Sequence, residues 1–203
     1  MALSERKYKK FECITFKNTK GKFGGLSNMA PGYPIMINDT IIRTVESFYQ
    51  ALRFPDYPDI QKIIIEFSSP ISAKKYGRNH IDKTRKDWGE NRFKLMKFCI
   101  ELKLDLNREN FTKILNLTKN LPIVEYTDKD KVWGATDEGE YYVGTNALGR
   151  LLMELRDKNR NKTITVEIPQ IDNLKFLNKK ITIDSIKPVP ENKINRLGQL
   201  WNK

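Results

Sequence analysis

Three polar residues are spaced so that they share one face of a short predicted helix. Thr44 can cap a helix over 45–54, and Glu46, Gln50 and Arg53 then stand at positions i, i+4 and i+7. Glu46 falls in the first turn, where unpaired backbone N–H groups and the helix dipole favour an ionised carboxylate. The pattern predicts a compact polar site opposite the apolar side of the helix, although an acidic first-turn residue is also ordinary helix chemistry.

A second polar cluster follows a predicted strand over 122–126. Asp128 and Asp130 stand shortly before Trp133 and Gly134 in the segment YTDKDKVWG. Polar side chains at strand ends often carry function. A solvated turn next to a core tryptophan is the structural alternative.

Two further features are compatible with ligand binding. The segment GTNALG, with Gly144 and Asn146, leads into a predicted helix whose N-terminal amides could hold a phosphate. Both residues would serve equally well as plain turn and cap residues. Trp88, at the start of a long predicted helix, is either a stacking platform for a base or a core residue.

The composition narrows the chemistry that is available. His80 is the single histidine, and Cys13 and Cys99 stand far apart, so neither a metal site nor a catalytic triad is indicated. No GxGxxG or Walker-type phosphate loop is present. We therefore expect catalysis by carboxylates, hydroxyls, amides or lysines, without a metal or cofactor.

The elements that must position these residues are predicted from apolar periodicity, caps and breakers. In chain order they are strands over 12–16 and 35–43, the helix over 45–54, a short helix from Ser69-Pro70 to Gly77, a longer helix opened by Asp87 with Glu90 as a capping box, a helix after Asn107, a strand over 122–126, a helix from about Ala147, and two strands over 164–168 and 179–186. We expect an α+β fold, mostly α-helical, with one main domain over 11–157 and a small basic C-terminal β appendage over 158–203.

Charge is concentrated at both ends of the chain. The net charge of the 203 residues is +12, with seven Lys or Arg against two Asp or Glu in 1–22, and ten against five in 157–203. Basic flanks favour a polyanionic partner such as nucleic acid, and a lysine-rich compositional bias is the alternative. No segment is apolar enough for a signal peptide or a membrane span, so we expect a cytoplasmic protein without a membrane partner.

The order of the motifs is more specific than any one of them. They are SN (27–28), TVESFYQALRF (44–54), SSP (68–70), RKDW (85–88), VEYTDKDKVWG (124–134) and GTNALGRLLMELR (144–156). This series, over about residues 11–157, resembles the NADAR family, which includes the YbiA-like N-glycosidases of riboflavin intermediates. The resemblance implies a YbiA-like fold and cleavage of N-glycosidic bonds.

The resemblance also implies roles for individual residues. Glu46 matches the family's essential glutamate, Trp88 its ligand-facing tryptophan, and Asp130 with Trp133 a second polar and aromatic pair. The implied pocket residues are Asn28, Gly134, Gly144 and Asn146. Arg53 and Arg85 are expected to pair with phosphates.

One departure from the family pattern concerns Arg53. Relatives commonly have lysine in the segment that reads QALRF here, and a lysine amine can form a Schiff base with ring-opened ribose. A guanidinium stays protonated and does not readily do so. Hydrolysis is then direct, or another lysine serves, or the protein binds without turnover. The segment GGLSNM also differs from the relatives, which more often have aromatic residues on both sides of SN, and we expect this difference to affect substrate choice.

Three functions follow from the resemblance and the charge. The first is a glycosidase that removes ADP-ribose from ADP-ribosylated guanine in nucleic acid. The second is a glycosidase of small phosphorylated riboflavin intermediates. The third is a non-catalytic module that recognises ADP-ribose or NAD, which the arginine at position 53 would permit.

Overall fold

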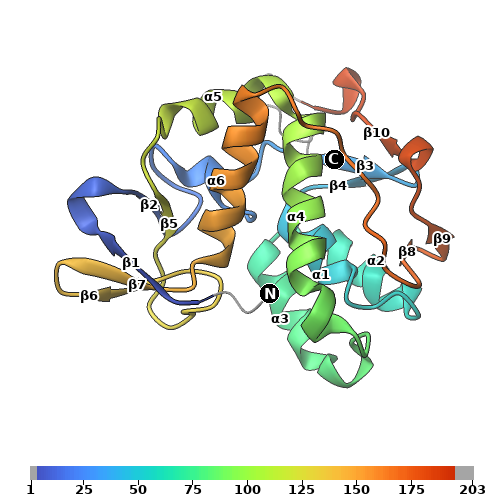
Figure 1. Cartoon of the computed structure of the whole chain (residues 1–203). Coiled ribbons are helices and arrows are strands. Elements are labelled where there is room, and N and C mark those ends of the chain that lie inside the picture. Colours follow the sequence, from blue (N-terminus) through green and yellow to red (C-terminus); the bar gives the residue numbers. More distant parts are fainter. Residues whose placement is uncertain (1–3, 195–203) are drawn as a thin grey trace. The chain divides into compact units, whose positions relative to one another are not determined.

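The computed structural model describes residues 4–194 and divides into two compact units, each assembled from two stretches of chain (Figure 1). Unit 1 contains the described residues up to 27 together with 109–165, and unit 2 contains 28–108 together with the described residues from 166 onward. Helices and small sheets occur in both units, which confirms the predicted α+β class. The predicted division into a domain over 11–157 and an extension over 158–203 stays a prediction.

Unit 1 is built on two small sheets. Its elements are β1 (Arg6–Lys9), β2 (Ile14–Phe16), β5 (Ile123–Glu125), β6 (Thr136–Glu138), β7 (Tyr141–Gly144), nearly all of α5 (Arg108–Leu117), and α6 (Ala147–Arg160). The antiparallel sheet has the order β1-β7-β6, while β2 pairs parallel to β5. The structure confirms the strands predicted over 12–16 and 122–126, which are β2 and β5. It also confirms the helices predicted after Asn107 and from about Ala147, which are α5 and α6. The short strands β1, β6 and β7 were not predicted, because segments of three or four residues carry little alternation.

Helix α6 lies close to β5 along its apolar side. Leu148, Leu152 and Leu155 are at most 3% exposed, as the helical spacing predicts. At Gly149 a side-chain carbon would collide with the backbone carbonyl of Ile123. A glycine is therefore needed where this helix passes the strand.

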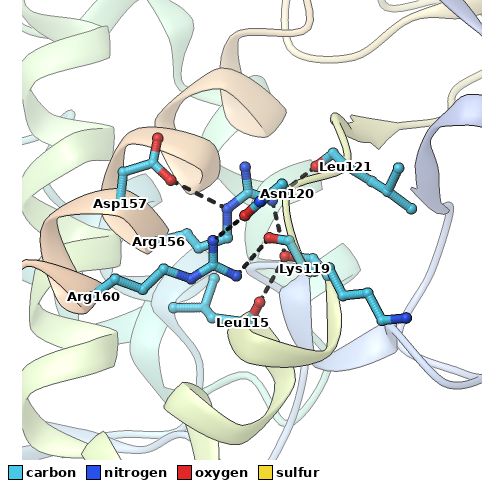
Figure 2. A network of polar contacts seen from close by, with 8 residues as sticks. Leu115, Lys119, Asn120, Leu121, Arg156, Asp157 and Arg160 are labelled. Atoms are coloured by element: carbon cyan, nitrogen blue, oxygen red, sulfur yellow. Dashed lines mark hydrogen bonds and ion pairs between the residues drawn. The ribbon is translucent and has the colours of Figure 1, made fainter.

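The last turns of α6 are fixed to the segment that follows α5 (Figure 2). Arg156 Nη1 donates to Thr118 Oγ1 at 3.0 Å and to Leu121 O at 2.7 Å, and Arg160 donates to Asn120 Oδ1 and Lys119 O, each at 2.6 Å. The two guanidinium groups thus satisfy backbone and side-chain oxygens of the turn that follows α5.

The sheet of unit 2 begins with a hairpin. It contains β3 (Ile35–Ile37) and β4 (Thr40–Ile42), which pair antiparallel, and β10 (Ile186–Lys187), which pairs with the other side of β3. The prediction of one strand over 35–43 is therefore wrong. Asn38 and Asp39 both have positive φ angles, of 49° and 61°, and form the tight turn that reverses the chain.

The described part of unit 2 contains four α-helices. They are α1 (Val45–Ala51), α2 (Pro58–Glu66), α3 (Pro70–Asn79) and α4 (Trp88–Leu106). The side chains of Thr44 and Ser69 cap α1 and α3 by accepting from Ser47 N and Ser72 N, as the sequence predicts for Thr44. Helix α1 is shorter than predicted, and α2 was not predicted.

One predicted helix end and one predicted capping box are wrong, although α4 does begin directly after Asp87. Helix α3 continues through Gly77 to Asn79, and Asp87 makes no capping bond to α4. The carboxylate of Asp87 instead accepts two bonds from Arg85, at 2.5 and 2.8 Å. A charged partner two residues away has displaced the weaker capping interaction.

The C-terminal segment contributes short strands to unit 2. Hairpin strands β8 (Lys175–Phe176) and β9 (Lys179–Lys180) precede a 3-10 turn over Ile183–Ser185 and then β10. The strand predicted over 164–168 is absent, and only the ends of 179–186 are extended in strands. Alternating residues form a strand only where a neighbouring strand is available for pairing.

Candidate active site

The predicted polar stripe of α1 is present, and it is buried. Glu46, Gln50 and Arg53 are 5%, 4% and 8% exposed. Every residue of α1 is buried, so the stripe does not face solvent as the helical pattern suggested. Buried polar groups need partners, and these three residues supply them to one another.

A chain of hydrogen bonds joins the three side chains. Gln50 Nε2 donates to Glu46 Oε1 at 2.8 Å, and Arg53 Nη1 donates to Gln50 Oε1 at 3.0 Å. Arg53 Nη2 completes the chain by donating to Thr84 Oγ1 at 3.0 Å. Because the carboxylate must accept and the guanidinium must donate, the chain fixes which way the Gln50 amide points.

The backbone also holds Glu46 in place. Its N–H donates to Asn28 O at 3.0 Å, in the first turn of α1. Among the residues that the structure describes, Glu46 Oε2 accepts no hydrogen bond. One carboxylate oxygen is thus positioned by Gln50, and the other is available to a ligand.

Two aromatic rings border this chain. The Trp88 ring lies 5.0 Å from the Tyr49 ring and 5.4 Å from the Arg53 guanidinium carbon, measured to ring centroids. Burial, followed by the negative charge of Glu46, raises the pKa of Tyr49 well above its ordinary value. Trp88 is half-buried, so it is neither a core residue nor a free platform.

Arg53 is more constrained than a surface arginine. Burial lowers the pKa of its guanidinium, and its Nε is buried without a partner among the described residues. Gly77 of α3 lies against it: a side-chain carbon there would be 3.3 Å from Gln50 Oε1 and 3.7 Å from Arg53 Nη1. Sequence reasoning missed Gly77 and Thr84 as members of this site, because neither is near α1 in the chain.

The backbone of Arg85 lies next to that of Arg53, because the Arg85 N–H donates to Arg53 O at 2.8 Å. Its side chain binds both oxygens of Asp87 and donates to Asp172 O at 2.7 Å. The hydrogen bond from Arg85 lowers the pKa of Asp87. Arg85 Nη1 remains buried without a partner among the described residues.

Asn28 has one unsatisfied atom as well. It is 4% exposed, its Nδ2 lies 2.8 Å from Met96 Sδ, and its Oδ1 is buried with no partner in the described part of the chain. A thioether is a weak acceptor. Asn28 therefore has unused capacity to bind a polar ligand.

The remaining predicted site residues lie in unit 1 and stabilise a tight loop. Asp130 Oδ1 accepts from Val132 N and Trp133 N at 3.1 and 3.0 Å, and Asp130 O accepts from Gly134 N. Side-chain carbons at Gly134 and Gly144 would collide with neighbouring backbone. Asp130 Oδ2 accepts no bond from the described residues.

The side chain of Asn146 and the first amides of α6 form hydrogen bonds within the protein. The fully buried Asn146 donates to Ile123 O at 2.8 Å and accepts from Glu125 N at 3.1 Å, and its φ of 49° is left-handed. The amides of Asn146, Ala147 and Leu148 donate to carbonyls of the preceding loop. These amides are thus occupied and do not form the phosphate site that the helix N-terminus suggested.

The eleven predicted site residues thus form two groups. Unit 2 holds Asn28, Glu46, Gln50, Arg53, Arg85 and Trp88, and unit 1 holds Asp130, Trp133, Gly134, Gly144 and Asn146. No group of three or more His, Cys, Asp or Glu that could hold a metal occurs among residues 4–194. Over the same residues, no helix is long and apolar enough to span a bilayer.

Comparison with known proteins gives consistent results. Residues 15–160 match the NADAR domain family. N-glycosidase YbiA of Shigella boydii serotype 4 is 33% identical over 145 residues, which cover 71% of this chain and 87% of that protein. Riboflavin biosynthesis protein PYRR, chloroplastic, of Zea mays is 33% identical over 159 residues, covering 71% of this chain and 25% of that protein.

A solved structure is similar as well. The NMR structure of YbiA from E. coli matches with a TM-score of 0.63 and 29% sequence identity, over 79% of this chain and 92% of that one. The predicted YbiA-like fold is thereby confirmed.

Proposed function

Because this chain belongs to the NADAR family, we propose that it is the N-glycosidase that removes ADP-ribose from ADP-ribosylated guanine in nucleic acid. Its relatives are named N-glycosidases, and the chain is a hydrolase of this kind. The choice of substrate rests on the basic flanks, which attract a polyanion.

The observation that carries the proposal is the hydrogen-bonded chain through Glu46. Breaking an N-glycosidic bond develops positive charge on the anomeric carbon of the ribose. A carboxylate with one oxygen fixed by Gln50 and the other free of protein donors suits stabilisation of that charge. Asn28 Oδ1, which is buried and has no partner within residues 4–194, is the acceptor we assign to a ribose hydroxyl.

The base and the phosphates are assigned to the neighbouring residues of unit 2. Trp88 is half-buried beside Tyr49 and provides an aromatic edge for the base. Arg53 Nε and Arg85 Nη1 are the unused donors assigned to phosphate oxygens. Gln50 acts by orienting Glu46.

For Asp130, in unit 1, water activation is proposed only as the role that the family resemblance implies. Its Oδ1 is used by the loop amides, so Oδ2 is the oxygen proposed to accept a proton from water. Trp133, Gly134, Gly144 and Asn146 are proposed to shape the loop that carries it. Direct hydrolysis is the mechanism proposed, because Arg53 offers no amine for a Schiff base.

The experiment compares wild type with Glu46→Gln on a guanine-ADP-ribosylated oligonucleotide, following release of ADP-ribose by mass spectrometry. The amide oxygen of the variant can still accept from Gln50, so the fold should be retained, as circular dichroism and thermal unfolding would check. We expect a loss of about 100-fold to 1,000-fold in kcat. A folded Glu46→Gln protein with wild-type turnover would refute the role of Glu46.

A second candidate substrate is a phosphorylated riboflavin intermediate. It is favoured by the similarity to the Zea mays protein named for riboflavin biosynthesis. Activity on the small substrate with none on the oligonucleotide would select it. Tight calorimetric binding of ADP-ribose or NAD without turnover of any substrate would instead indicate a binding module.

A further inference from the structure

The segment after residue 171 packs into the core of unit 2, beyond the end of the family match at 160. Phe176 is fully buried, and its ring meets that of Phe48 of α1 edge-on, at 5.5 Å between centroids and 86° between planes. Leu174 and Ile181 are 6% and 1% exposed. Helix α1, which carries Glu46, therefore rests on side chains from the C-terminal segment.

A buried glutamine joins this segment to α1. Gln61 of α2 is 0% exposed, and its Nε2 donates to Ala51 O at 3.2 Å and to Lys175 O at 3.1 Å. Its Oε1 accepts from Leu177 N at 2.7 Å. The Gln61 side chain thus bonds the last residue of α1, the first residue of β8 and the residue that follows β8.

The turn at residues 172 and 173 reaches the arginine of the site. Asp172 O accepts from Arg85 Nη2 at 2.7 Å, and Asn173 Nδ2 donates to Asp56 Oδ1 at 2.7 Å. Asn173 has a φ of 52°, in the left-handed region. The turn is therefore anchored next to the point where it contacts Arg85.

Because of these bonds, Nη1 is the one guanidinium nitrogen of Arg85 that has no acceptor among the described residues. Its Nε and Nη2 are engaged by Asp87 and Asp172, and Nη1 is buried without an acceptor among the described residues. Because the guanidinium is planar and its Nε and Nη2 are held, the direction in which Nη1 points is fixed.

We propose that the turn at Asp172 and Asn173 is a positioning element that aims Arg85 Nη1 at a phosphate of the substrate. This rests on the proposed function, and the phosphate is one of the two phosphates of ADP-ribose. The proposal assigns a role in ligand binding to Asp172 and Asn173, which lie outside the family match. Asn173, held by Asp56, acts on the ligand only through Arg85.

The test uses full-length protein and two readouts: calorimetric binding of ADP-ribose, and KM with kcat on the ADP-ribosylated oligonucleotide. Asn173→Asp removes the hydrogen bond to Asp56 and brings two carboxylates together in its place. Both residues are exposed, so the substitution does not change the core of unit 2. We expect Kd for ADP-ribose and KM each to rise about threefold to tenfold, with kcat unchanged.

The matched control exchanges donor and acceptor. The double variant Asp56→Asn, Asn173→Asp can form the same bond in the opposite direction, so its Kd and KM should return to wild-type values. Arg85→Lys, which keeps the charge but loses the fork, should weaken ADP-ribose binding at least as much as Asn173→Asp.

Three results would overturn the inference. They are an unchanged Kd in Asn173→Asp, a weakening that the double variant does not restore, and a wild type that does not bind ADP-ribose. A wild type that binds ADP-ribose with the expected response of each variant, yet turns over no substrate, would support the positioning role and refute the proposed hydrolysis.

Discussion

Replacing Gly77 by alanine should separate stability from activity. Gly77 lies within α3, where alanine is favoured over glycine by about 1 kcal/mol. The new methyl would lie 3.3 Å from Gln50 Oε1, closer than carbon and oxygen normally approach, and 3.6 Å from the Phe54 ring. Gln50 must retreat by a few tenths of an ångström, and this offsets part of the gain.

The retreat of Gln50 acts on Glu46. Gln50 is bonded on both sides, to Glu46 at 2.8 Å and to Arg53 at 3.0 Å, so it cannot move without disturbing one of them. Misplacement by 1 Å can cost about 100-fold in rate, so a smaller shift should lower kcat about threefold to tenfold. The midpoint of thermal unfolding should stay within about 4 °C of wild type, since the two stability effects oppose each other.

The control is Gly89→Ala. Gly89 also lies in a helix, α4, and a side-chain carbon there would meet nothing within 4 Å. This variant should keep the wild-type kcat on the ADP-ribosylated oligonucleotide, with unchanged or higher thermal stability. If Gly77→Ala retains the same kcat as Gly89→Ala, the position of Gln50 does not matter for catalysis and the reasoning is refuted.

Two other predictions follow. Arg53→Lys introduces the lysine that the family resemblance implies, but one amine cannot bond both Gln50 and Thr84 as the guanidinium does, so we expect lower stability. On borohydride reduction with substrate, the variant should form a covalent adduct that is absent from wild type. An adduct in wild type would contradict direct hydrolysis. Burial lowers the pKa of the fully buried Lys103 well below its ordinary value, so its contribution to stability is present above pH 10.5 and is lost as pH falls through the folded-state pKa. Lys103→Met should therefore raise the unfolding midpoint more at pH 7 than at pH 10.5, and an equal effect at both pH values would contradict this.

Local chemistry made several features predictable. Thr44 and Ser69 start their helices because a hydroxyl three residues before an amide needs no distant partner. The spacing of Glu46, Gln50 and Arg53 likewise predicted their contact, since i, i+3 and i+4 neighbours meet on any helix.

Features that depend on distant partners, or on a choice between competing local interactions, were missed. Thr84 and Gly77 join the site through packing of separate helices, and α1 is buried on all sides only because other elements surround it. Asp87 had the pattern of a cap, but Arg85 is a stronger partner for its carboxylate. The turn at Asn38 and Asp39 carried a readable signal, since both residue types tolerate positive φ, and the longer apolar run obscured it.

The interleaving of the two units has a consequence for synthesis on the ribosome. Strand β1 is made first, but its partner β7 lies about 130 residues later in the chain. At ordinary rates of elongation, β1 waits roughly 7 to 26 s for that partner to emerge. Unit 1 therefore cannot complete its β1-β7-β6 sheet until β7 has been made.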